Sequence, residues 1–96
     1  MAYFAIVEDL VDTGLKGKVF YPPLITASIA SKFIKEKGCK FKIFDADGNV
    51  YYKGIVVLGK DDTGFEPLDY LGPSVGATSI EYYGANSKTQ RMTGIL

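Results

Sequence analysis

Paired aromatic residues are the side chains of this sequence best suited to binding a ligand or a partner. The chain has seven Tyr and six Phe in 96 residues, and eight of them stand in adjacent pairs. The pairs are Tyr3-Phe4, Phe20-Tyr21, Tyr51-Tyr52 and Tyr82-Tyr83. Successive side chains of a strand point to opposite faces, so each pair in a regular strand places one ring on each face of a sheet. The pairs therefore predict aromatic rings on a sheet face that no helix covers.

Three interpretations of these rings are open. Tyr tolerates a half-hydrated surface, so the rings can be ordinary surface residues. Tyr and Phe are also enriched in protein interfaces, which favours a homo-oligomer or another protein as the partner. Exposed rings of a sheet also stack on nucleobases and other planar ligands. The candidates for an interface or for ligand stacking are Tyr3, Tyr21, Tyr51, Tyr52, Tyr82 and Tyr83.

The segment 13–18, Thr-Gly-Leu-Lys-Gly-Lys, has the composition of an anion-binding loop. It lacks the spacing of a P-loop and the three glycines of a dinucleotide fingerprint, so an ordinary turn is favoured. If an anion such as a nucleotide phosphate binds, we expect Lys16, Lys18 and Arg91 to contact it.

Acidic residues occur in two segments that could bind a cation. Residues 45–49, Asp-Ala-Asp-Gly-Asn, space their oxygens as a calcium loop does at its start, but Val50 and Val56 stand where such a loop needs Gly and Glu. The Asp-Gly pair inside this segment favours a hairpin turn instead. The second segment, 61–69, holds four scattered acids, which are typical of a solvated loop. We predict no metal and no cofactor.

The residue types that are missing exclude several kinds of catalytic site. The chain has no His, which excludes a His general base, a His metal ligand and a Ser-His-Asp triad. Its single cysteine, Cys39, excludes an intrachain disulfide and a multi-cysteine zinc site. Because none of these catalytic constellations is present, we favour a non-enzymatic protein. Catalysis by carboxylates, lysines or tyrosines stays open as an alternative.

The formal net charge is zero, but charge alternates along the chain. Residues 1–15 carry −3, residues 16–42 carry +6, residues 43–82 carry −5 and residues 83–96 carry +2. A pI of about 6.2 and a single arginine disfavour nucleic-acid binding. Every apolar run is shorter than the roughly 18–20 residues of a membrane span, and a lone cysteine suits a reducing compartment. We therefore expect a cytoplasmic protein with no membrane partner.

The candidate residues lie on segments with recognisable periodicity. Strand composition or alternation is found at 3–11, 40–45, 50–58 and 78–83, with a short fifth segment at 19–21. Residues 23–37 have apolar side chains at three-to-four spacing and predict an amphipathic helix that ends at Gly38.

The segment 65–76 contains two prolines and two glycines, which predict irregular chain, with a short helix at 68–71 as the alternative. Long loops without regular structure often bind ligands. A pocket in this segment would have Tyr70 and Ser74 near its floor.

These elements predict an α+β domain over residues 1–83: a mainly antiparallel sheet of about four strands with one amphipathic helix packed on one face, in the order β-(β)-α-β-β-β. Residues 84–96 are predicted to form a polar, flexible tail. We expect a non-enzymatic binding module that self-associates through the sheet face opposite the helix. The alternative is a small-ligand or nucleotide-binding protein, and a histidine-independent enzyme comes third.

Overall fold

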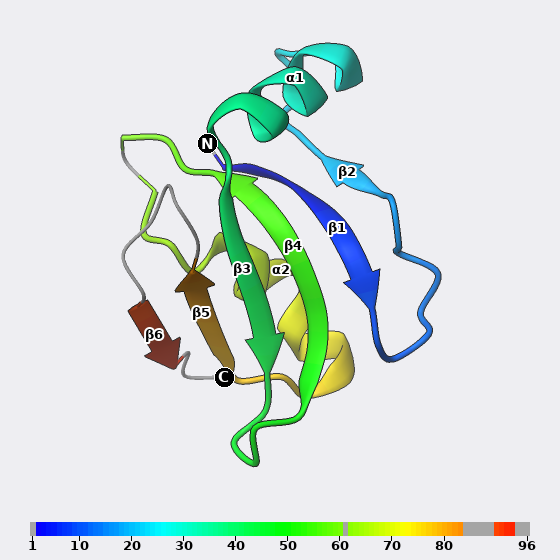
Figure 1. Ribbon diagram of the computed structural model, residues 1–96, viewed down its shortest axis with the longest axis vertical. Coiled ribbons are helices and arrows are strands. Elements are labelled where there is room, and N and C mark those ends of the chain that lie inside the picture. Colours follow the sequence, from blue (N-terminus) through cyan, green and yellow to red (C-terminus); the bar gives the residue numbers. More distant parts are fainter. Residues whose placement is uncertain (1, 61, 84–89, 94–96) are drawn as a thin grey trace.

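The chain forms one antiparallel sheet and two helices (Figure 1). The computed structural model describes residues 2–60, 62–83 and 90–93. The elements are β1 (Tyr3–Asp9), β2 (Val19–Phe20), α1 (Ala27–Lys37), β3 (Cys39–Phe44), β4 (Val50–Val57), α2 (Glu66–Val75), β5 (Ser79–Tyr83) and β6 (Gln90–Thr93). The strands lie in the order β2-β1-β4-β3-β5-β6, and each neighbouring pair is antiparallel. The predicted α+β class is confirmed, with more strands than the four expected and with a second helix.

The predicted hairpin turn is confirmed between β3 and β4. Gly48 has a φ of +85°, which glycine adopts without steric cost. Its N–H donates to the Asp45 carbonyl at 3.1 Å. The Asp45 carboxylate accepts the N–H groups of Asp47 and Asn49, each at 2.9 Å. These bonds fix the turn and with it the register in which β3 and β4 pair.

The predicted amphipathic helix is confirmed as α1, although it begins one turn later than predicted, at Ala27. The Thr26 hydroxyl accepts the N–H of Ile29 at 3.2 Å and caps the helix at this point. The helix ends at Gly38, as predicted. It lies across the end of the sheet, where it contacts β1 and β4 (Figure 1).

The segment 65–76, predicted to be irregular, contains helix α2, so that prediction was wrong. Three apolar residues recur there at helical spacing, Leu68, Leu71 and Val75. Pro67 lies in the first turn, where a missing N–H leaves no hydrogen bond unmade. Pro73 lies inside the helix near its C-terminal end, and Gly76 caps the helix, so these breaker residues do not prevent it.

Helix α2 encloses the hydrophobic core against one face of the sheet. In Figure 1 it lies behind β3 and β4. Within the described residues, neither helix lies over the centre of the opposite face, which we call the open face. The core cluster consists of buried residues from four central strands, from α2 and from the segment after α2: Phe4, Ile6, Phe41, Ile43, Tyr52, Val56, Leu68, Leu71, Ala77, Ile80 and Tyr82.

Part of the predicted C-terminal tail belongs to the sheet. Residues 90–93 form β6, whose backbone pairs with β5 from Ser79↔Thr93 to Tyr82↔Gln90. The other residues for which a flexible tail is predicted, 84–89 and 94–96, lie outside the described residues.

The packing at the centre of the core requires a glycine at position 54. Gly54 stands opposite Phe41 on one side and Ile6 on the other. A Cβ atom at Gly54 would lie 2.6 Å from Cζ of Phe41 and would overlap the carbonyl oxygen of Ala5. The fully buried Phe41 ring therefore packs directly on the β4 backbone, and the Phe4 ring meets it edge-on at 6.1 Å.

We predict that Gly54→Ala lowers the free energy of unfolding by roughly 2–4 kcal/mol, because the added methyl group forces Phe41 and the β1 backbone apart. Urea denaturation followed by circular dichroism measures the change. Lys53→Ala, one residue away on the open face, is the control and should change stability by less than about 1 kcal/mol. A Gly54→Ala variant as stable as the wild-type protein would show that the core does not depend on this contact.

Candidate functional site

The aromatic doublets divide between the core and the surface, as strand alternation predicts. Tyr52 and Tyr82 are only 1% and 4% exposed. These two tyrosines are therefore core residues and not the interface or stacking residues that the sequence suggests. Tyr3, Tyr51 and Tyr83 are half-buried, and Tyr21 is exposed.

The two buried tyrosines use their hydroxyl groups to hold loops. Tyr82 donates to the carbonyl of Gly64 at 2.6 Å, and burial raises the pKa of this phenol above its usual value. The hydroxyls of Tyr52 and Thr13 lie 2.8 Å apart. The hydroxyl of Thr13 donates to Asp9, so Tyr52 is the donor to Thr13.

Two of the half-buried tyrosines are also engaged within the chain. Tyr51 donates its hydroxyl to the Asp45 carboxylate at 2.9 Å, a hydrogen bond that raises the pKa of Tyr51. The ring of Tyr3 lies 6.4 Å from that of Phe33 on α1. These contacts brace the hairpin turn and α1, which is a structural role for both rings.

Aromatic rings from three elements converge on one concavity, which we call the aromatic groove. The rings come from β1, from β2 with the residue after it, and from α2. The groove has a volume of about 360 Å³ and is lined by Ala2, Phe4, Phe20, Tyr21, Pro22, Pro23, Asp62, Glu66 and Tyr70.

Three rings in the groove, those of Phe4, Phe20 and Tyr70, contact one another. Phe4 and Phe20 are stacked, with centroids 5.0 Å apart and planes at 27°. Tyr70 lies 4.8 Å from Phe20 at 55° and 6.1 Å from Phe4 at 70°. Phe4 is buried, whereas Tyr70 is 63% exposed and Tyr21 is 43% exposed. The groove therefore has a rigid apolar floor and two accessible tyrosines at its rim.

A negative charge is fixed at one end of the groove. The Glu66 carboxylate accepts the N–H groups of Thr63 and Gly64 at 2.9 and 2.8 Å, and the Thr63 hydroxyl at 3.3 Å. Partial burial acts to raise the pKa of Glu66, but these hydrogen bonds outweigh it and hold the pKa below its usual value. Asp62, a second acid, also lines the groove and contacts the N–H of Gly59.

The sequence identifies only part of this site. Tyr21 and Tyr70 are predicted from separate motifs, and the structure brings them to one groove. Ser74, predicted beside Tyr70, donates instead to the carbonyl of Leu71 at 3.2 Å and does not line the groove. Phe4 and Phe20 belong to the aromatic doublets, and two prolines follow the doublet at 20–21, but no pattern in the sequence indicates that these residues meet.

The open face carries a row of charged residues at its centre. In the strand register Glu81, Lys42, Lys53 and Glu8 stand opposite one another in this order, and the backbone of Arg91 on β6 stands opposite Glu81, so the row crosses five neighbouring strands. Lys42 and Glu81 form an ion pair at 3.0 Å. Like charges directly opposite each other, as at Lys42 and Lys53, are normally destabilising. The centre of the open face is therefore charged rather than aromatic.

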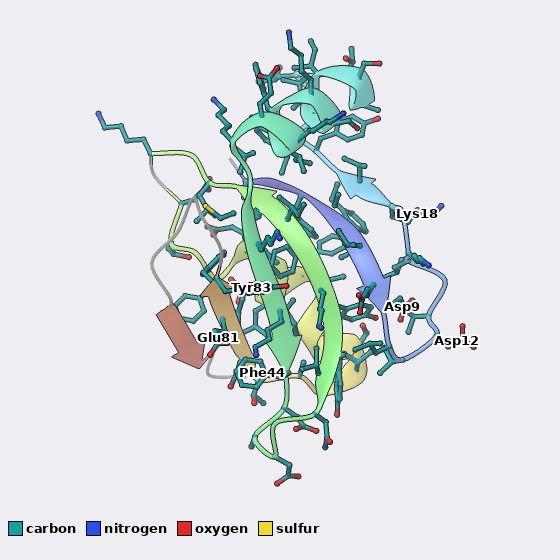
Figure 2. All side chains as sticks on the ribbon, in the orientation of Figure 1. Asp9, Asp12, Lys18, Phe44, Glu81 and Tyr83 are labelled. Carbon is teal, nitrogen blue, oxygen red and sulfur yellow. The ribbon has the colours of Figure 1, made fainter. Side chains whose placement is uncertain are left out.

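Apolar side chains flank the charged row toward α1. Figure 2 shows Tyr83 and Glu81 along β5 on this face. A shallow hollow of about 240 Å³ lies there, lined by Val7, Glu8, Lys40, Lys53, Gly54, Ile55 and Tyr83. In the register, Tyr83 and Ile55 stand on either side of Lys40.

The lysine-containing loop after β1 is held by hydrogen bonds to the carboxylate of Asp9. The Asp9 carboxylate accepts the N–H groups of Val11, Thr13 and Leu15 at 3.1, 2.8 and 3.0 Å. In an anion-binding loop such N–H groups would point at the ligand. Lys16 and Lys18 are exposed beside this loop (Figure 2 labels Lys18). Asp9 thus occupies the position that a bound phosphate would take, which disfavours an anion site at these lysines. Arg91 was the third predicted anion contact, and only its backbone is described.

Comparison with models of known protein families, with curated protein sequences and with solved structures gives no match. In the described ranges, neither helix has the length and apolar character needed to cross a bilayer. The same ranges contain no group of three or more His, Cys, Asp or Glu residues placed to hold a metal ion. The aromatic groove is therefore the candidate site, and its function has to be argued from its geometry.

The Asp9 loop makes stability depend on pH. Burial acts to raise the pKa of Asp9, but its four hydrogen bonds outweigh this and lower the pKa below the ordinary value of about 3.9. The stabilising contribution is therefore complete above that ordinary value and is lost as pH falls through the lower, folded-state value.

We predict that Asp9→Asn lowers the free energy of unfolding by roughly 1–2 kcal/mol near neutral pH, since charge-assisted hydrogen bonds are lost. The difference from the wild-type protein should shrink as pH falls below the ordinary value of about 3.9 and through the lower pKa of folded Asp9, because the wild-type carboxyl group then becomes protonated. Thermal unfolding across this pH range measures both effects. Asp12→Asn is the control, because Asp12 lies in the same loop (Figure 2) and makes no hydrogen bond with a described residue. If the stability difference between Asp9→Asn and the wild type were the same at all pH values, the ionised Asp9 carboxylate would not be what stabilises the loop.

Proposed function

We propose that the protein is a non-enzymatic binding module whose ligand site is the aromatic groove. The observation that carries the proposal is the convergence of Phe4, Phe20, Tyr21 and Tyr70 on one apolar concavity. A concave, mostly apolar surface with a few polar groups is the usual form of a small-ligand or peptide site. The rim tyrosines offer stacking area at little cost in side-chain entropy.

The state of the acids supports binding rather than catalysis. Asp9, Asp45 and Glu66 have lowered pKa values, because each accepts several hydrogen bonds from its own loop. A general acid at neutral pH needs a raised pKa. A cytoplasmic location belongs to the same proposal, on the evidence of the single thiol of Cys39.

We predict that the neutral planar probe indole binds in the groove. In a ¹⁵N NMR titration the amide signals of Tyr21, Glu66 and Tyr70 should shift together. Tyr70→Ala should weaken binding about tenfold, as expected for the loss of one stacking ring. Tyr83→Ala, an equal truncation on the open face, is the matched control and should leave the affinity unchanged. Shifts confined to the open face, or no saturable shift, would refute the proposal.

Self-association through the open face is the second candidate, and the charged row favours it. Two copies could pack with their open faces together, related by a two-fold axis parallel to β3. The charged row of one copy would then lie against the row of the other copy in reversed order. This places Glu81 against Lys53 of the second copy. In the next row it places Tyr83 against Ile55. Lys42 would meet its own copy at the axis, where the ion pair with Glu81 reduces repulsion.

We predict that Lys53→Glu abolishes this association and that adding Glu81→Lys restores it, because the exchange returns opposite charges to facing positions. Sedimentation velocity at micromolar concentration and low salt measures the assembly. Lys60→Glu, a charge reversal at an exposed residue outside the row, is the control. A wild-type protein that sediments as a monomer would remove this candidate without affecting the groove.

A further inference from the structure

We propose that the aromatic groove takes the guanidinium group of an arginine side chain presented by a partner peptide. The inference rests on the proposed function and adds the chemical class of the ligand. It is carried by the juxtaposition of stacked rings and fixed carboxylates in one concavity.

The first argument is charge complementarity. The face of an aromatic ring carries the negative part of its quadrupole, so the accessible tyrosines of the groove attract a cation. Glu66 and Asp62 add carboxylates to the same lining. No lysine or arginine lines the groove, so its described charges are all negative.

The second argument is the position of Glu66 relative to Tyr70. The two residues are four apart on α2, so their side chains are neighbours on one face of the helix. Hydrogen bonds from Thr63 and Gly64 hold the carboxylate in place. A carboxylate oxygen that accepts one such bond can accept another. A cation stacked on Tyr70 would thus find an ionised, immobilised acceptor one helical turn away.

The third argument selects guanidinium among cations. A guanidinium is planar and weakly hydrated, so it can stack on a ring while its edge donates hydrogen bonds to a carboxylate. An ammonium group is compact and strongly hydrated and cannot do both in the same way. Phe20 and Tyr70, 4.8 Å apart, give a flat group two rings to contact.

The fourth argument selects a peptide rather than a free small molecule. Tyr21 and Tyr70 leave the groove open to solvent, so a small ligand would stay largely hydrated. The groove also adjoins β2, the terminal strand of the sheet, because Phe20 of β2 lines it. An extended peptide beside this edge could add main-chain hydrogen bonds to the side-chain contact.

The test compares two peptides that differ at a single side chain, a charged guanidinium in one and a neutral urea group in the other. Acetyl-Gly-Gly-Arg-Gly-Gly-amide and the same peptide with citrulline have side chains of nearly equal shape, but citrulline is neutral. In a ¹⁵N NMR titration we expect the arginine peptide to bind about tenfold more tightly, with shifts at Tyr21, Glu66 and Tyr70. Free arginine amide should bind more weakly than the arginine peptide.

Substitutions test whether the preference for the arginine peptide arises in the groove. Glu66→Gln should remove most of the difference between the two peptides, and Asp69→Asn should preserve it. Asp69 is the matched control, because it carries the same charge in the same helical turn but does not line the groove. Tyr70→Phe should keep the affinity, since the ring is retained, whereas Tyr70→Ala should reduce it for both peptides.

The outcomes separate this inference from the proposed function. If indole binds in the groove and the two peptides bind equally, the cation preference is overturned while the groove remains a binding site. If free arginine amide binds as tightly as the peptide, the assignment to a peptide is overturned. If neither peptide nor indole binds, the proposed function and this inference fail together.

Discussion

The missing side chain at Gly54 is the constraint on which the rest of the structure depends. It allows the Phe41 ring to lie against the β4 backbone at the centre of the sheet. Phe41 supports Phe4 edge-on, and Phe4 in turn is stacked with Phe20 and meets the ring of Tyr70. The groove is thus the outer end of a line of rings that begins in the core. The rim residue Tyr70 therefore stands on rings that are packed into the core.

Internal carboxylates order the loops of this small domain. Asp9, Asp45 and Glu66 each accept backbone N–H groups from residues close to them in sequence. In the sequence Asp45 resembles the start of a calcium loop, and Glu66 resembles part of a solvated acidic loop. In the structure they satisfy donors that a turn would otherwise leave to water. Only Glu66 also lines a concavity, which is why it alone among the three can act on a ligand.

Local signals in the sequence predict the local structure well. The Asp-Gly turn, the cap at Gly38 and the alternation of the doublets all lead to the observed elements, because each depends on neighbours within a few residues. Helix α2 was predicted only as a short alternative at 68–71, because its prolines and glycines outweighed the spacing of Leu68 and Leu71. The groove as a whole could not be predicted: Phe4, Phe20 and Tyr70 meet only after strand pairing and the packing of α2, and no short-range pattern encodes that meeting. The same is true of the charged row, which exists only in the register of five strands.

The order of the strands also determines how the protein can fold. β1 pairs with β4 through contacts such as Tyr3↔Val57, although the two strands are far apart in the sequence, and its other neighbour is the two-residue β2. The β3–β4 hairpin, by contrast, joins strands that are adjacent in sequence. Closing the long loop between β1 and β4 costs chain entropy before any contact repays it, so we expect the hairpin to form first and β1 to dock onto it later. Phe4, at the floor of the groove, belongs to β1, so on this folding order the groove is completed only when the whole sheet has assembled.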